Sequence, residues 1–289
     1  MNWERERATW PHSRHSRFVA AGPHRWHVQQ MGEGPDIVLL HGAGASTHTW
    51  RDVMPLLAAD HRVTAMDMPG QGFTRRGAQG RSGLRETAGD LALLLGALGI
   101  ERPRALVGHS AGAVIAARML LDGTPGRLVS INGAFDPFEG IAGVLFPLVA
   151  KLLSVNPLTV PLFTLGTQNP ARARRLIEGT GSRIDEAGIA LYHRLIRDPG
   201  HVDGALAQMA AWRHAGLREE MARRLDRPAL LLSGGRDRTV PPRISSELAA
   251  ALPRARERRE EALGHLMHEE APDLAAGAIR DFLSEPDRA

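Results

Sequence analysis

The sequence has no cysteine, and this absence excludes several kinds of protein. A chain without thiols forms no disulfide bonds, thiolate zinc sites or iron–sulfur clusters, and it uses no cysteine nucleophile. Its 289 residues are enough to bury a sizeable core without such links. The charged first residues are not followed by the apolar segment of a secretory signal, so we expect a cytoplasmic protein.

Aromatic residues and lysine are scarce as well. Only 4% of the residues are aromatic, and Lys151 is the single lysine, so arginine carries nearly all of the positive charge. The formal net charge is +4, and the arginines are scattered among acidic residues. Nucleic-acid binding needs a clustered basic surface that also carries aromatic side chains. We therefore expect no nucleic-acid partner.

Short apolar runs alternate with longer amphipathic segments along most of the chain. Helix-length segments between the runs indicate an α/β fold with a mostly parallel, doubly wound sheet. Ahead of them, Ser16–Ala20 and Arg25–Gln30 are expected to pair antiparallel at one edge of this sheet. The expected buried strands are Asp36–Leu40, His61–Met66, Arg104–Val107, Arg127–Ile131 and Pro228–Leu232.

The alternation breaks between residues 136 and 226, which contain helical segments and no convincing strand. This stretch is too long for a simple crossover between two strands. We interpret residues 136–226 as a helical cap over the carboxyl edge of the sheet, and residues 1–135 and 227–289 as the core. The expected cap helices are Ala171–Glu178, Glu186–Arg197 and Val202–Ala215.

One part of the cap is unusually poor in charge. Lys151 is the only charged residue between Gly140 and Ala171, but four prolines interrupt this stretch, so no membrane-spanning helix is expected. The prediction is an apolar lid packed on the core, with a pocket lined by residues of Ile141–Phe163. A substrate entrance, or a face that contacts a membrane surface, is the alternative.

The motif G-x-S-x-G at Gly108–Gly112 directly follows the apolar run Arg104–Val107 and precedes a helical segment. A serine placed in this way between a strand and a helix is typical of a nucleophile elbow. The glycines are needed because a Cβ atom at either position would collide with neighbouring backbone. The turn holds the Ser110 hydroxyl at a helix N-terminus, where backbone N–H groups stabilise negative charge. Ser110 is therefore the candidate nucleophile.

A second glycine-rich segment, His41–Ala45, follows the expected strand Asp36–Leu40. Such a loop can bind phosphate, but it completes neither G-K-[ST] nor G-x-G-x-x-G, so no nucleotide cofactor is expected. A serine nucleophile needs backbone donors for the negative charge that develops on the substrate oxygen. The N–H groups of Ala43 and Ala111 are the candidate oxyanion hole.

A serine nucleophile also needs a base and a group that orients the base. Asp237 follows the last expected strand, and His265 lies between a short extended segment and a helix. The chain order Ser110, Asp237, His265 is the one that the α/β-hydrolase layout requires. Asp136 is the alternative acid, and His268 is the second candidate base. Neither an H-E-x-x-H motif nor a third ligand accompanies these histidines, so no metal is expected.

Together, these motifs resemble the α/β-hydrolase superfamily over nearly the whole chain, in the branch with a helical cap between strands six and seven. The chain also resembles the magnesium chelatase accessory proteins of bacteriochlorophyll biosynthesis (BchO type). In two places it departs from that pattern, with Ala43 where threonine is common and Gln71 where many relatives have histidine. The segments that carry the second resemblance are Asn2–Arg5, Trp10–Pro11, Ser16–Val19, Arg25–Gln29, Gly44–Trp50 and the cap stretch Leu176–Arg183.

The candidate nucleophile, base and acid predict a serine hydrolase that acts on an ester or thioester of a hydrophobic substrate. The second resemblance implies a place in tetrapyrrole synthesis, near the magnesium-insertion step, and contact with magnesium chelatase, but it implies no particular reaction. The alternative is a non-catalytic porphyrin-binding or chelatase accessory protein on a hydrolase scaffold. In that case arginines of the cap would pair with propionates. These arginines are Arg174, Arg175, Arg183, Arg194, Arg197 and Arg213.

Overall fold

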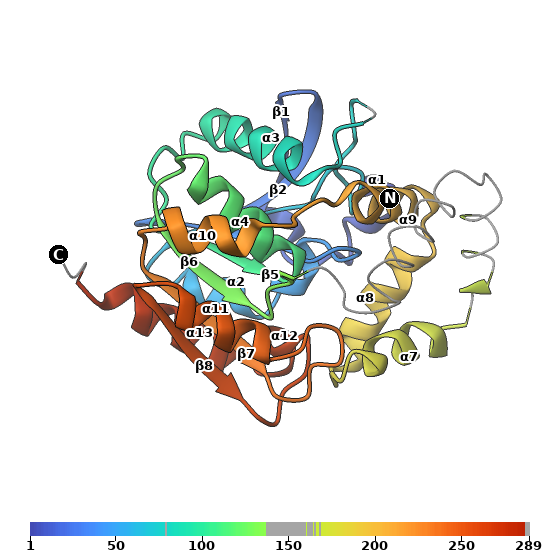
Figure 1. The fold of residues 1–289 in the computed structure, drawn as a ribbon. Coiled ribbons are helices and arrows are strands. Elements are labelled where there is room, and N and C mark those ends of the chain that lie inside the picture. Colours follow the sequence, from blue (N-terminus) through green and yellow to red (C-terminus); the bar gives the residue numbers. More distant parts are fainter. Residues whose placement is uncertain (79, 137–159, 161–163, 165, 168, 287–289) are drawn as a thin grey trace.

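The computed structural model describes residues 1–78, 80–136, 160, 164, 166–167 and 169–286, and its centre is an eight-stranded sheet (Figure 1). The strands lie in the order β1-β2-β4-β3-β5-β6-β7-β8. β3 to β8 run parallel, and β2 is antiparallel to both β1 and β4. The strands are β1 (Ser16–Ala21), β2 (His24–Met31), β3 (Asp36–Leu40), β4 (Arg62–Met66), β5 (Ala105–His109), β6 (Arg127–Ile131), β7 (Ala229–Gly234) and β8 (Ala255–Glu260).

The central strands are apolar on both faces because helices cover both faces of the sheet. Side chains alternate along β3, so that Val38 and Leu40 join one buried cluster while Ile37 and Leu39 join the other. The first cluster includes residues of α3 (Leu84–Ala97), α4 (Ala111–Leu121), α10 (Leu217–Arg224) and α11 (Arg243–Ala251). The second includes residues of η2 (Thr47–Trp50), α2 (Val53–Leu57), α12 (Met267–Glu270) and α13 (Pro272–Ser284).

Three cap helices lie to one side of the sheet, at the right of Figure 1: α7 (Ala171–Gly179), α8 (Glu186–Ile196) and α9 (Pro199–Ala211). The side chains of Asp185 and Asp198 cap α8 and α9 by accepting hydrogen bonds from backbone N–H groups of their first turns. The cap helices follow β6 and precede β7. The structure thus confirms an α/β fold with a helical cap inserted between strands six and seven.

The first residues of the chain lie beside the cap. They form two short helices, α1 (Trp3–Glu6) and η1 (Ser13–His15). The Met1 amino group donates hydrogen bonds to the Gly72 carbonyl and to the Asp198 carboxylate, both at 3.2 Å. This contact joins the N-terminal segment to the start of α9.

Two elements differ from the sequence prediction. The helix predicted at Val202–Ala215 starts at Pro199, because Asp198 caps it, and ends at Ala211; the separate helix α10 follows it. β8 was expected only as a short extended segment ahead of His265 and not as one of the buried strands, because its sequence, ARERRE, is charged; its four central side chains are exposed at the sheet edge. Among the described helices, none has the length and apolar character needed to cross a membrane. The predicted pocket lining at Ile141–Phe163 lies, apart from Val160, outside the described residues.

Candidate active site

Ser110 lies at the junction between β5 and α4, with backbone angles of φ 50° and ψ −115°. Few residues other than glycine adopt a positive φ, so this turn is held by its surroundings. A Cβ atom on Gly108 would lie 2.3 Å from backbone atoms of Gly112 and Ala113, and one on Gly112 would lie 2.1 Å from the Leu40 carbonyl oxygen. The structure thus confirms why the motif needs glycine at both positions.

Asp237 and His265 come from the loops that follow β7 and β8, and they are in direct contact. The Nδ1 atom of His265 lies 2.7 Å from Oδ2 of Asp237, and both residues are buried. A histidine that donates from Nδ1 to a carboxylate keeps Nε2 available as a base. The geometry is that of an oriented imidazole.

The Asp237 carboxylate accepts three further hydrogen bonds. Its Oδ1 atom accepts from the backbone N–H groups of Thr239 and Val240, at 2.7 and 2.9 Å. Its Oδ2 atom also accepts from the Asn132 side chain at 2.7 Å. With His265, these donors fix the direction of the carboxylate. Asn132 was missed by the sequence analysis, although its position directly after β6 is the same signal that singled out Asp237 after β7.

Asp136, the alternative acid, has a different partner. Its Oδ2 atom accepts a hydrogen bond from Arg218 at 2.5 Å. The second candidate base, His268, is fully buried, and its Nε2 atom lies 2.8 Å from the Thr49 hydroxyl. Burial lowers the pKa of His268 to about 3, so its ring is neutral at neutral pH. The structure therefore brings Asp237, and not Asp136, against His265.

The loop that contains Ala43 is held by buried polar side chains. The Gly44 N–H donates to Oε1 of Gln71 at 2.7 Å, and Nε2 of Gln71 donates to Gln208 of α9 at 2.8 Å. His201 donates from Nε2 to the Gly44 carbonyl at 3.1 Å, and its Nδ1 accepts from the Gly72 N–H. Gln71 thus links the candidate oxyanion loop to the cap.

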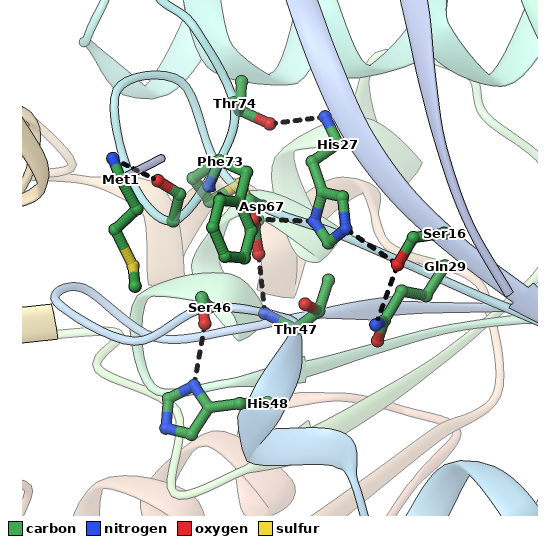
Figure 2. A network of polar contacts seen from close by, with 12 residues as sticks. Met1, Ser16, His27, Gln29, Ser46, Thr47, His48, Asp67, Phe73 and Thr74 are labelled. Atoms are coloured by element: carbon green, nitrogen blue, oxygen red, sulfur yellow. Dashed lines mark hydrogen bonds and ion pairs between the residues drawn. The ribbon is translucent and has the colours of Figure 1, made fainter. Parts of the chain in front are cut away.

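A second Ser-His-Asp arrangement lies beside the N-terminal strands (Figure 2). His27 contacts Asp67 through Nδ1 at 2.8 Å and Ser16 through Nε2 at 3.0 Å. Asp67 also accepts from the backbone N–H groups of Thr47 and Phe73, at 2.7 and 2.8 Å. These donors and the buried His27 lower the pKa of Asp67 despite its burial. The network fixes the loops that contain Thr47 and Phe73.

Most of the predicted site residues, but not Asp237, line a cavity of about 550 Å³. Ser110, His265 and both candidate oxyanion residues, Ala43 and Ala111, line it. The cap supplies a further part of the wall. The other lining residues are Gly42, Ala45, His109, Ala134, Asp136, Ile177, Thr180, Tyr192, Met209, Trp212, Arg213, His214, Ala215, Thr239 and Leu266.

A family model for the alpha/beta hydrolase fold matches residues 35–272, which include the elbow, the acid loop and the histidine loop. The chain belongs to the α/β-hydrolase family. A solved enol-lactonase from Burkholderia xenovorans LB400 superposes on this chain with a TM-score of 0.75 at 22% identity, covering 93% of this chain and all of the other. That similarity shows the fold.

Curated relatives of this α/β hydrolase fall into more than one functional group. The chain is 43% identical to the magnesium-chelatase 30 kDa subunit of Rhodobacter capsulatus, over 96% of its own length and 97% of the relative. This match confirms the resemblance suggested by the sequence. This chain is also 32% identical to 2-hydroxymuconate semialdehyde hydrolase of Pseudomonas sp. strain CF600, over 94% of each chain. Within the described residues, no group of three or more potential metal-binding side chains is present.

Proposed function

We propose that this protein is a serine hydrolase that cleaves an ester or thioester of a hydrophobic substrate. The observation that carries the proposal is the position of Ser110 on a strained elbow, in the same cavity wall as His265, whose Nδ1 atom contacts Asp237. Strained backbone held by its surroundings is common at reactive residues. The apolar character of much of the lining, which includes Ile177, supports a hydrophobic substrate.

In the proposed mechanism, Oγ of Ser110 attacks the acyl carbon while Nε2 of His265 takes the hydroxyl proton. Asp237 holds the imidazole by its Nδ1–H and stabilises the imidazolium that forms. The N–H groups of Ala43 and Ala111 bind the negative oxygen of the tetrahedral intermediate. His265 then gives its proton to the leaving alcohol or thiol. Water, deprotonated by His265, releases the acyl group and regenerates Ser110.

A fluorophosphonate probe tests this function directly, because such probes react with activated serines. Wild-type protein should be labelled, and peptide mapping should place the adduct on Ser110. Ser110→Ala should abolish labelling. Ser16→Ala is the matched control, because Ser16 also contacts a histidine that is paired with an aspartate. If folded wild-type protein forms no adduct at Ser110, the proposed hydrolase function is wrong.

The second candidate function is a non-catalytic accessory role at magnesium chelatase. It is favoured by the 43% identity to a protein named as a subunit of that enzyme. In this case the cavity would hold a tetrapyrrole and the chain would contact the chelatase in the cytoplasm or at a membrane surface. Both candidates place the protein in bacteriochlorophyll synthesis, but only the first needs the Ser110 hydroxyl.

A further inference from the structure

The arginines of the cap differ in where they lie. Arg174 pairs with Glu186, and Arg194 pairs with Glu6 at 3.3 Å. Arg213 instead lines the cavity that contains Ser110, just after the end of α9. It is the only arginine or lysine in the described lining of that cavity.

Arg213 is exposed, and backbone carbonyl groups hold one end of its guanidinium. Its Nη1 atom donates to the carbonyl groups of Ala210 and Trp212, at 3.1 and 2.9 Å. A guanidinium carries five N–H donors, so these two contacts leave three for another partner. Among the residues that the structure describes, no carboxylate forms an ion pair with Arg213. The other charged lining residue, Asp136, pairs with Arg218 instead.

The residue after Arg213 contributes a buried polar atom to the same wall. His214, the next residue in the cavity wall, has a buried Nε2 atom without a hydrogen bond among the described residues. Burial lowers the pKa of His214 and favours its neutral ring. A buried polar atom without a partner is costly, and a bound ligand is one way to satisfy it.

We propose that the substrate carries a carboxylate besides its ester, and that Arg213 binds this carboxylate. The inference rests on the proposed hydrolase function and narrows its substrate class to acidic, mainly apolar esters or thioesters. Arginine suits this role because its planar fork binds a carboxylate through two parallel hydrogen bonds. The apolar remainder of the lining takes the hydrocarbon part of the ligand.

Monomethyl sebacate and dimethyl sebacate form a matched pair of probes, since they differ only in one free carboxylate. Wild-type protein should release methanol from the monoester with a kcat/KM about tenfold higher than from the diester. Arg213→Gln should remove this preference, and Arg197→Gln, at an exposed cap arginine outside the cavity, should keep it. Equal rates on both probes would overturn the inference while leaving the hydrolase function standing.

Calorimetric binding of the same probes to Ser110→Ala protein tests the inference without turnover. The monoester should bind about tenfold more tightly than the diester, and the Arg213→Gln change should equalise the two. If wild-type protein hydrolyses neither probe and is not labelled by fluorophosphonate, the proposed function fails. The binding ratio then still decides whether Arg213 recognises a carboxylate.

A separate observation concerns the turn between α7 and α8, residues 180–183. The Thr180 carbonyl accepts a hydrogen bond from the Arg238 N–H at 3.0 Å, next to Asp237. The Ser182 hydroxyl accepts one from the Leu266 N–H at 2.7 Å, next to His265. One turn of the cap therefore holds both loops of the acid–base pair.

The packing of this turn leaves no room for side chains between the backbones. Gly181 has a φ of +88°, and a Cβ atom on it would lie 1.9 Å from the Arg236 carbonyl oxygen. A Cβ atom on Gly264 would lie 2.4 Å from the Gly181 backbone. Glu270 joins the two segments further, because its carboxylate accepts from the N–H groups of Gly264 and Arg183.

We infer that Ser182 is a positioning residue that sets the geometry of the His265–Asp237 pair, which again presumes the proposed function. His265 lies between Gly264 and Leu266, whose N–H groups are fixed by Glu270 and Ser182. Ser182 is itself almost fully buried. Its removal would leave the Leu266 N–H without a partner and let the histidine loop shift. Ser182 belongs to the cap stretch Leu176–Arg183, which carries the resemblance to the magnesium chelatase accessory proteins. The inferred positioning gives this stretch a role in the site.

Ser182→Ala should lower kcat about tenfold and leave KM unchanged, because a small displacement of a reacting group is costly. Ser182→Thr, which keeps the hydroxyl, should recover most of the rate. Ser130→Ala is the control, since Ser130 is a buried serine whose hydroxyl has no partner among the described residues. An unchanged kcat in Ser182→Ala, or a loss that threonine does not reverse, would overturn the inference.

Proton NMR gives a second readout that does not depend on turnover. The proton between His265 and Asp237 should give a far-downfield signal that shifts or disappears in Ser182→Ala and persists in Ser130→Ala. An unchanged signal in Ser182→Ala would count against the positioning role. A wild type that shows this signal but resists fluorophosphonate would instead contradict the hydrolase function alone.

Discussion

Ser110 has a backbone conformation that costs about 1–3 kcal/mol for a residue with a side chain. The hydrogen bond from its N–H to the Ile131 carbonyl, at 2.9 Å, helps to maintain this conformation. Its side chain faces a cavity and not the packed core, so its hydroxyl adds little to the stability of the fold. Chemistry, and not packing, is therefore the property that a substitution here should change.

Ser110→Ala should leave the melting temperature equal or slightly higher, because only one oxygen at a cavity wall is removed. If the chemistry is used in the cell, the variant should fail to restore bacteriochlorophyll in a deletion strain, at protein levels matched to wild type. Pigment extraction measures the bacteriochlorophyll, and immunoblotting measures the protein level. Full restoration by the variant would mean that the pathway uses the scaffold, and the accessory function would then replace the hydrolase.

Gly112→Ala should destabilise the protein by about 3 kcal/mol or more, because its Cβ atom would lie 2.1 Å from the Leu40 carbonyl oxygen. The nearest atoms around this Cβ belong to the backbone, so no flexible side chain can move aside to make room for it. Gly89→Ala is the matched control, since Gly89 lies inside α3 with no atom within 4 Å of the added Cβ. The free energy of unfolding of this control should rise by about 0.5–1 kcal/mol. Urea unfolding of both variants measures the difference in stability. A Gly112→Ala variant as stable as wild type would contradict the inference that the elbow has no room for a side chain at this position.

The sequence predicts the chemistry-bearing residues of the site better than the residues that support them. Ser110 and His265 stand out because motif and chain order identify them together. Asn132, Gln71 and Ser182 act through contacts between segments far apart in the chain, and their types are common in any loop. Their partners become visible only when β6, α9 and the histidine loop are placed in space.

At the scale of elements, a buried ionic cluster ties the cap to the core. Arg51, just after η2, pairs with Glu269 of α12, and with Asp185 at the start of α8 at 2.9 Å. Glu269 also accepts hydrogen bonds from Thr49 at 2.6 Å and from Tyr192 of α8 at 2.7 Å. Burial raises the pKa of Glu269, while these partners oppose that rise.

Arg51→Ala should destabilise the protein by about 3–5 kcal/mol, because it leaves the fully buried Glu269 carboxylate without its cation. The double variant Arg51→Met/Glu269→Gln should be less destabilised than Arg51→Ala, since it removes the buried charge as well. Chemical unfolding of wild type and both variants gives the comparison. If the double variant unfolds at lower denaturant than Arg51→Ala, the cost does not come from an unpaired charge.

Elements were predictable where the local pattern agreed with the final environment. The strand Arg127–Ile131 has the predicted bounds because an apolar run is buried on both faces. The helix Ala171–Gly179 was predicted nearly to its ends. β8 was not, because a charged edge strand is specified by its pairing with β7 and not by its own composition.

At the scale of the whole molecule, several histidines are buried in neutral form. Burial lowers the pKa of His201 to about 4 and of His268 to about 3, and holds the pKa values of His48 and His109 well below their usual range. In the unfolded chain these side chains take up protons near pH 6.5. Between pH 6.5 and about 4 the unfolded state thus binds more protons, and stability falls as the pH falls. The raised pKa of Glu269 acts in the opposite sense, but it is a single group against four.

The melting temperature should therefore drop by at least about 5 °C between pH 7 and pH 5. At pH 5, His201 and His268 each contribute about 2 kcal/mol to this loss, because pH 5 lies about 1.5 units below their pKa in the unfolded chain and above their pKa in the folded protein. Calorimetry across this range measures how steeply the melting temperature falls with pH, and His201→Gln should make this fall less steep. A melting temperature that is constant or rises towards pH 5 would show that these histidines are not neutral in the folded protein.

The insertion of the cap between β6 and β7 has a consequence for how the chain folds. β6 ends at Ile131 and its neighbour β7 begins at Ala229, so about 100 residues must be looped out before the two strands pair. Closing such a loop costs about 4 kcal/mol of chain entropy. Ser110 lies before this loop, and Asp237 and His265 lie after it. During refolding, the arrangement of Asp237 and His265 beside Ser110 should consequently form later than the burial of Trp26 and Trp50, whose fluorescence reports the part of the sheet formed by the first half of the chain.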